Sequence, residues 1–199
     1  LGILGLVVLN VTIILLFVDL VGGGAVIYFT PKKNDRALWI TSVLWALFSI
    51  FLVFVFGFIL DYFPIIRDFI IPKGYWYYTL FLVLATTFNQ INYSFLIGKE
   101  MIREYNLIYS IHIILLLVIV LIFFYAFGDV SVVSFIIAEY IALSLSVIIG
   151  WWFLIPVFDE KEEYMFIPLF KEMFKYSLFG QSSNALTIIN KRISFYVIN

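Results

Sequence analysis

Residues 107–127, LIYSIHIILLLVIVLIFFYAF, decide the fold class of this chain. The stretch carries no aspartate, glutamate, lysine or arginine, and it is rich in leucine, isoleucine and phenylalanine. An α-helix rises about 1.5 Å per residue, so a helix of roughly 20 residues crosses the hydrocarbon core of a bilayer. We therefore interpret the stretch as a transmembrane helix.

The composition of all 199 residues extends this interpretation to the rest of the chain. Hydrophobic residues make up 64% and charged residues 13%, with a mean hydropathy of +1.11. Soluble domains are about half apolar and about a quarter charged, so we expect an all-α polytopic membrane protein. Besides 107–127, four apolar stretches are long enough to span a membrane: 1–29, 37–60, 75–98 and 131–155.

The composition also excludes several classes of function. A net charge of −1 gives no support for a nucleic-acid partner, and the absence of cysteine rules out disulfides and thiolate metal sites. His112 is the only histidine, so a multi-histidine metal site is excluded, and we expect neither metal nor cofactor. We find no P-loop, HExxH or nucleophile-elbow motif and therefore do not expect an enzyme.

The chain starts inside an apolar run and stops just after another, and its cations are unevenly divided among the polar turns. We expect a fragment, with at least one helix missing before it and more after it. Turns 31–36, 99–106 and 156–175 hold three, two and three lysines or arginines. Turns 61–74 and 128–130 hold two and none, so the positive-inside rule places the first group in the cytoplasm.

The first span contains Asp19 and a glycine triplet at 22–24. Each glycine weakens a helix by about 1 kcal/mol relative to alanine, but in membranes it also lets a neighbouring backbone approach closely. We favour a packing notch over a hinge for a moving helix. A buried carboxylate at Asp19 costs about 2.5 kcal/mol or more unless it is protonated or paired, so a structural pair and a proton-coupling site both remain open.

The third span carries amides in its middle. Asn89 and Asn92 are three residues apart and therefore share one helix face. They either hydrogen-bond a neighbouring helix or line a hydrated path, and the sequence leaves the two alternatives balanced. The adjoining strip of the same helix holds Thr86, Gln90 and Tyr93.

Glu139 is a carboxylate within the last complete span, in the outer half of the membrane by the orientation above. We expect structural pairing with Lys191 or Arg192, with a proton-coupling site as the alternative. His112 lies near the start of its own span. We expect it to be a satisfied side chain close to the cytoplasmic interface.

The final stretch, 176–199, reads YSLFGQSSNALTIINKRISFYVIN and carries Asn190, Lys191 and Arg192. If it forms one helix from the cytoplasm, the two cations lie about 23 Å along it, beyond the membrane centre. Intramembrane charges usually face a bundle interior or a water-filled cavity. The alternative is that the helix ends near Asn190 and both cations snorkel to the outer surface. We favour the cavity, because the part before Lys191 is too short to span.

Three segments carry a resemblance to a known family. They are 19–39, DLVGGGAVIYFTPKKNDRALW; 92–111, NYSFLIGKEMIREYNLIYSI; and 169–198, LFKEMFKYSLFGQSSNALTIINKRISFYVI. In order, they resemble the second helix with its basic turn, the junction of helices four and five, and the entry to helix seven of Wzx-type oligosaccharide flippases. These flippases belong to the multidrug/oligosaccharidyl-lipid/polysaccharide exporter superfamily. Ser194 stands where the family's Asn-x-Arg-x-Asp-like patch ends in aspartate.

The resemblance implies a fragment of a MATE-like two-lobe transporter, with helices two to six and most of helix seven. Residues 1–155 would form N-lobe transmembrane helices, and 156–175 would be the cytoplasmic link between the lobes. Residues 176–199 would start the C-lobe. The implied location is the bacterial cytoplasmic (inner) membrane, with the chain crossing it several times.

The function implied by the resemblance is translocation of an undecaprenyl-diphosphate-linked oligosaccharide by alternating access, for O-antigen (lipopolysaccharide), capsule or exopolysaccharide biosynthesis. Arg192 is the first choice for the diphosphate, because its guanidinium can pair with phosphate in two places. The other cavity candidates are Lys191, Asn190, Asn89, Asn92, Glu139 and Asp19. Expected partners are this cargo, membrane lipids and other glycan-assembly proteins. The alternatives are a membrane enzyme of surface-glycan assembly, either a polymerase or an acyltransferase, and a drug exporter of the same superfamily.

Overall fold

The structure, a computed structural model, describes residues 2–62, 74–129, 131–158, 165–178 and 180. This described part contains helices and no strand, which confirms the expected all-α class for it. The main helices are α1 (Ile3–Val18), α2 (Gly23–Phe29), α3 (Asp35–Asp61), α5 (Trp76–Gly98), α6 (Ile102–Phe127) and α7 (Val132–Leu154). A short 3-10 helix, η1 (Ile155–Val157), follows α7, and residues 166–178 form a further helix.

Five segments in the described part are long and apolar enough to cross a membrane, as expected for a multi-pass protein. They are Ile3–Phe29, Asp35–Leu60, Trp76–Gly98, Ile102–Phe127 and Val132–Val157. Four of them begin within two residues of the predicted starts. The fourth span begins at Ile102 rather than at 107. Residues 102–106 include polar and charged side chains and fall in the predicted turn 99–106, but they already belong to the helix. The polar turn before it is correspondingly shorter than predicted.

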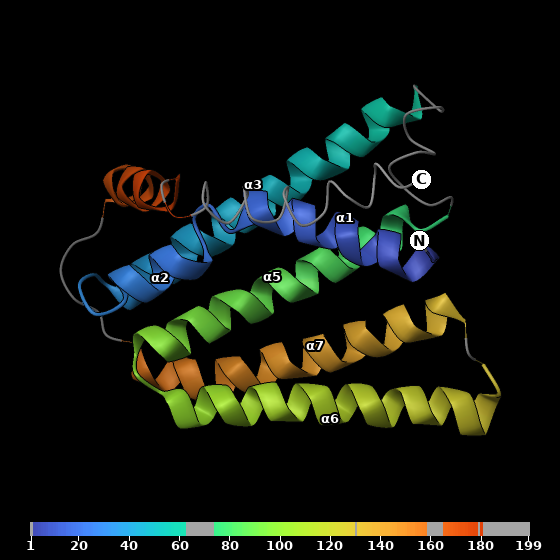
Figure 1. Cartoon of the computed structure of the whole chain (residues 1–199). Helices are drawn as coiled ribbons and strands as arrows, with labels where there is room; N and C mark the ends of the chain where they lie inside the picture. The colour runs from blue at the N-terminus through green and yellow to red at the C-terminus, as the bar shows by residue number, and fades with distance from the viewer. Residues whose placement is uncertain (1, 63–73, 130, 159–164, 179, 181–199) are drawn as a thin grey trace.

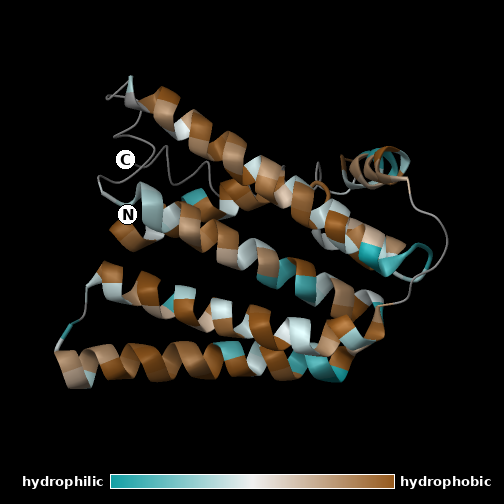
Figure 2. Cartoon of the chain, turned by 180° about the vertical axis from the view of Figure 1, so that it is seen from behind, coloured by the Kyte–Doolittle hydropathy of each residue, from teal (hydrophilic) through white to brown (hydrophobic). Residues whose placement is uncertain are grey.

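Helix α5 lies at the centre of the bundle (Figure 1). It contacts α1, α2 and α3 on one side and α6 and α7 on the other. In its most apolar window 61% of the residues are buried, against 6% in α6, which lies at the edge and packs mainly on α7. Figure 2 shows hydrophobic residues covering most of α6. Helix α6 is therefore the element that a lipid environment would contact most.

Small residues let α5 approach its neighbours closely. A Cβ added to Gly98 at the end of α5 would lie 2.8 Å from the Thr30 side chain, and one added to Gly150 on α7 would lie 2.6 Å from Nδ2 of Asn92. Such short distances leave no room for a side chain. Glycine therefore sets the α2–α5 and α5–α7 spacing, as is common in membrane bundles.

The first span is interrupted between Val18 and Gly23, and the glycine triplet marks the interruption. Gly23 has a φ of +45°, which L-residues with a side chain rarely adopt. Around Gly22 and Gly23 only Asp19 and Val18 lie within 4 Å of an added Cβ, and around Gly24 nothing does. The predicted packing notch is therefore wrong. These glycines break the helix, and within the described residues no atom of another helix lies within 4 Å of a Cβ added to them.

The helix over 166–178 crosses the end of the bundle near the turn at 31–36, where Figure 1 views it along its axis. Leu169 and Met173 are buried in the common core. The ring of Trp45 on α3 lies 5.5 Å from that of Phe170 and 5.8 Å from that of Phe174. This segment is thus held to the bundle by one apolar side. The remainder of the expected link, 159–164, and most of 176–199 lie outside the described residues.

Candidate functional site

A pocket of about 290 Å³ lies between α1, α5, α6 and α7. Its α1 wall consists of Leu4, Val8, Val11 and Thr12. The other walls are Leu82 and Thr86 of α5, Leu116 of α6, and Phe135, Ile136 and Glu139 of α7. We call it the Glu139 pocket, because Glu139 is the ionisable residue among those that line it. The two threonine hydroxyls donate to carbonyls of their own helices, so they add little free polarity.

Glu139 faces His112 on the neighbouring helix. Oε1 of Glu139 lies 3.4 Å from Nε2 of His112, a distance for electrostatic attraction that lacks hydrogen-bond geometry. Both side chains are mostly buried, with exposed fractions of 22% and 14%. Because α6 begins at Ile102, His112 lies about 15 Å along it. His112 therefore lies further along its helix than its position in the predicted span indicated, and its expected place near the cytoplasmic interface stays a prediction.

Asn89 and Tyr93 are buried or half-buried polar residues of α5, the helix that also supplies Leu82 and Thr86 to the Glu139 pocket. Asn89 is 3% exposed, and Tyr93, four residues further along α5, interacts electrostatically with Glu139. The Tyr93 ring packs edge-on against Tyr105 at 5.1 Å. Oδ1 of Asn89, the Tyr93 hydroxyl and Oε2 of Glu139 meet no hydrogen-bond partner in the described part of the chain. Most buried polar atoms are paired, so three unsatisfied atoms here mark a polar interior with capacity for further hydrogen bonds.

Asn92, by contrast, has a structural partner. Its Nδ2 donates to the carbonyl oxygen of Val147 on α7 at 3.0 Å, and its side chain packs on Gly150. Of the two alternatives for the amides, Asn92 therefore takes the interhelical hydrogen bond. It is 1% exposed and does not line the Glu139 pocket.

Asp19 caps the C-terminus of α1 at the interruption of the first span. With the Gln90 amide oriented to satisfy both groups, its nitrogen donates to Oδ1 of Asp19 at 2.9 Å and lies 3.3 Å from Oδ2. This contact joins α1 to α5 and does not line the Glu139 pocket. In the sequence, Gln90 belongs to the polar strip beside Asn89. Nothing in the spacing of Gln90 indicated that Asp19 is its hydrogen-bond partner.

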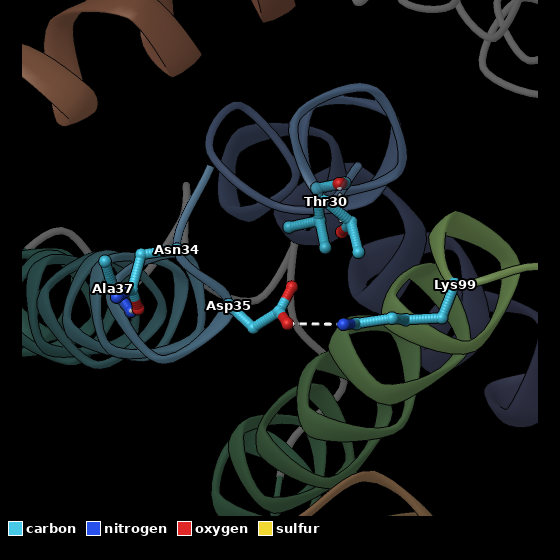
Figure 3. Close-up of polar contacts among 6 residues, drawn as sticks. Thr30, Asn34, Asp35, Ala37 and Lys99 are labelled. Carbon is cyan, nitrogen blue, oxygen red and sulfur yellow. Dashed lines mark hydrogen bonds and ion pairs between the residues drawn. The ribbon is translucent and has the colours of Figure 1, made fainter. Parts of the chain in front are cut away.

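A buried ion pair that sequence reasoning missed closes one end of the bundle (Figure 3). Oδ2 of Asp35 lies 2.5 Å from Nζ of Lys99, and the two side chains are 1% and 17% exposed. Asp35 occupies the first turn of α3, where the helix dipole favours a negative charge. Asn34 caps the same turn by accepting from the Ala37 N–H at 3.0 Å. The two charges lie in different polar turns, so the sequence shows each as an ordinary loop residue.

The remaining predicted cavity residues, Asn190, Lys191 and Arg192, lie outside the described residues. The same holds for their expected pairing with Glu139. Within the described ranges, no group of three or more histidine, aspartate or glutamate residues could hold a metal ion. The residues that the structure brings together are thus Glu139, His112, Asn89 and Tyr93, beside an otherwise apolar pocket.

Comparison of the chain with protein-family models, with curated proteins and with solved structures gave no match.

Proposed function

We propose that this chain is part of a flippase that moves an undecaprenyl-diphosphate-linked oligosaccharide across the bacterial cytoplasmic membrane by alternating access. The observation that carries the proposal is the half-open Glu139 pocket with its nearby polar groups, lined by helices apolar enough to cross a membrane. Ionisable and unsatisfied polar groups at such a depth are costly. Their presence supports a path for a polar cargo, and the resemblance to Wzx-type flippases supplies the cargo.

Two groups of residues suit the two parts of the cargo, the sugars and the diphosphate. Carboxylate and amide oxygens accept hydrogen bonds, so Glu139 and Asn89 suit the hydroxyl groups of sugars. A diphosphate needs cations, and among the described residues the lysines and arginines lie in turns, in first helical turns or in the helix over 166–178, which is not one of the five spans. Arg192 therefore remains the proposed diphosphate ligand, by resemblance to the family and by the geometry of its guanidinium.

One observation favours a second candidate, a drug exporter of the same superfamily. Glu139 is the ionisable residue of a pocket with an otherwise apolar or hydroxyl lining. A carboxylate in apolar surroundings is the natural counter-ion for an organic cation. This candidate assigns Glu139 to the cargo and gives Arg192 no cargo contact.

Export of surface glycan by the intact protein tests the first candidate. The full-length gene is expressed in cells that lack their own O-antigen flippase, with Arg192→Ala, Arg192→Lys and Lys171→Ala as variants. We expect export to fall at least tenfold with Arg192→Ala, to be partly restored with Arg192→Lys, and to be unchanged with Lys171→Ala, which alters an exposed lysine. Full export with Arg192→Ala would contradict the assignment.

The effect of Glu139→Gln separates the two candidates. The flippase predicts a moderate loss of glycan export, because glutamine still accepts hydrogen bonds from sugar hydroxyls. The drug exporter predicts that cells expressing the wild-type protein resist lipophilic cations such as ethidium, and that Glu139→Gln abolishes this resistance. Resistance without any glycan export would replace the first candidate with the second.

A further inference from the structure

The interruption of the first span is stabilised by donors from α3. In a continuous helix the carbonyls of Val18 and Val21 would accept from the N–H groups four residues later. Instead, Nε1 of Trp45 donates to the Val18 carbonyl at 3.0 Å, and the Ser42 hydroxyl donates to the Val21 carbonyl at 3.1 Å. Helix α3 thus satisfies the two carbonyls that the break exposes, and the break is part of the folded structure.

The two sides of the break differ in how tightly they pack. On the α2 side, Gly98 of α5 lies so close that an added Cβ would be 2.8 Å from Thr30 and 3.2 Å from the Ile27 carbonyl oxygen. On the α1 side, four residues of α1 form one wall of the Glu139 pocket, a space of about 290 Å³. Helix α2 therefore has no room to move against α5, whereas the pocket leaves free space beside one side of α1.

The break also has the backbone properties of a hinge. Hinges are a few residues at element ends that absorb changes in φ and ψ. Among the described residues, a Cβ added to Gly22, Gly23 or Gly24 would meet only residues 18 and 19 within 4 Å, apart from the chain neighbours. Asp19, at the pivot, is held to α5 through Gln90. The glycines thus have room around their Cα atoms, while Asp19 beside them is held to α5.

We infer that α1 is a gate over the Glu139 pocket, swinging on the break at residues 19–24 while α2 stays fixed to α5. The gate rests on the proposed function in one respect, namely that the pocket belongs to the transport path. Opening would widen the pocket on the side that Leu4, Val8 and Val11 line and would increase the 22% exposure of Glu139. The far end of α1 would move most, by about 4 Å for each 10° of swing, because its 16 residues rise about 24 Å.

Distance measurement between spin labels tests the gate directly. The 199 residues contain no cysteine. Once any cysteine elsewhere in the intact protein is replaced, pairs of spin labels can be attached to introduced cysteines. The labelled protein is measured in lipid nanodiscs without cargo. The test pair is Ile3→Cys on α1 with Phe127→Cys on α6, and the control pair is Phe127→Cys with Ile148→Cys on α7. All three positions are exposed. We expect two populations for the test pair and one narrow population for the control pair.

Two glycine variants provide a matched comparison. Gly23→Ala disfavours the positive φ of the break and should shift the two populations of the test pair toward one. Gly24→Ala lies in ordinary helix with open space around it and should leave both populations unchanged.

A single narrow population for the test pair in the unsubstituted background, as narrow as the control, would overturn the gate whatever the glycine variants do. Glycan export is measured separately in cells that express the same variants. Two distance populations without export would keep the gate and contradict the proposed cargo. One narrow population with export would contradict the gate and keep the proposed cargo.

Discussion

The Asp35–Lys99 pair shows how a single buried contact can matter more than several exposed ones. Its carboxylate is 1% exposed, whereas the Lys33–Glu172 pair at the same end of the bundle has side chains that are 40% and 50% exposed. Exposed pairs contribute about 0–1 kcal/mol. Removing one partner of a buried pair costs about 3–5 kcal/mol, because the other charge stays in the interior.

Lys99→Met should therefore lower the free energy of unfolding by about 3 kcal/mol or more. The matched control is Lys33→Met, which should change it by less than about 1 kcal/mol. Reversible denaturant unfolding of the purified protein in mixed micelles measures both. Equal effects of the two substitutions would show that the Asp35–Lys99 contact does not hold the turn between α2 and α3 against α5.

The contact of Asn92 with Gly150 supports a second prediction at this scale. Gly150→Ala forces a Cβ to within 2.6 Å of Nδ2 of Asn92 and should destabilise the protein by about 1–3 kcal/mol. In an Asn92→Ala background the clashing amide is gone, so the same substitution should cost at most about half as much. A double-mutant cycle on the free energy of unfolding measures this coupling. Additive effects would contradict the close approach of α5 and α7.

At the scale of elements, the turn between α6 and α7 is closed by a carboxylate. The Ser134 hydroxyl and the Ser131 backbone N–H donate to Asp129, and these bonds hold the pKa of Asp129 below its ordinary value of 3.8. Gly128 ends α6 in the left-handed conformation, with a φ of +64°. The turn is therefore specified by a left-handed glycine, by the N-cap Ser131 and by the hydrogen bonds that Asp129 accepts.

This carboxylate predicts a defined pH dependence for Asp129→Asn. A carboxylate with a lowered pKa in the folded state stabilises that state above its unfolded pKa and loses the contribution as the pH falls through the folded value. The wild-type protein should therefore melt at a higher temperature than the variant at pH 7. The difference should shrink only below about pH 3.8. Melting curves of both proteins from pH 7 to pH 3 measure it, and a difference that disappears already at pH 5 would assign it to another group.

The same elements show which features a sequence can predict. Long apolar runs fix the spans, because length and hydropathy are local properties, and the starts of α5 and α7 fall within one residue of the prediction. The effect of the glycine triplet was not predictable, because notch and break differ in whether another helix approaches. The partner of Glu139 was also not predictable. His112 meets it only because α6 and α7 pack side by side.

At the scale of the whole molecule, the five spans alternate in direction around α5, so their connecting turns gather at two ends (Figure 1). The turn at 31–36, the α5–α6 turn and the helix over 166–178 lie at one end, where Lys33 meets Glu172. The end of α3 and the α6–α7 turn lie at the other. The cation count of the sequence predicts that the first end faces the cytoplasm, which gives every described turn a predicted side.

Cysteine accessibility in intact cells tests that orientation for the whole molecule. Single cysteines at Tyr62 and Phe127 lie at the end predicted to face outward, and Met165→Cys lies at the opposite end; all three positions are at least 72% exposed. A membrane-impermeant maleimide should label the first two in intact spheroplasts and should label Met165→Cys only after the membrane is opened. The positive-inside rule acts through short loops near the spans, and replacing Lys32, Lys33 and Arg36 together should weaken the bias without touching the buried Lys99. If Met165→Cys alone were labelled in intact cells, the orientation would be the reverse of the predicted one. The end of the Glu139 pocket near the start of α1 would then face the cytoplasm, and cargo would have to enter there.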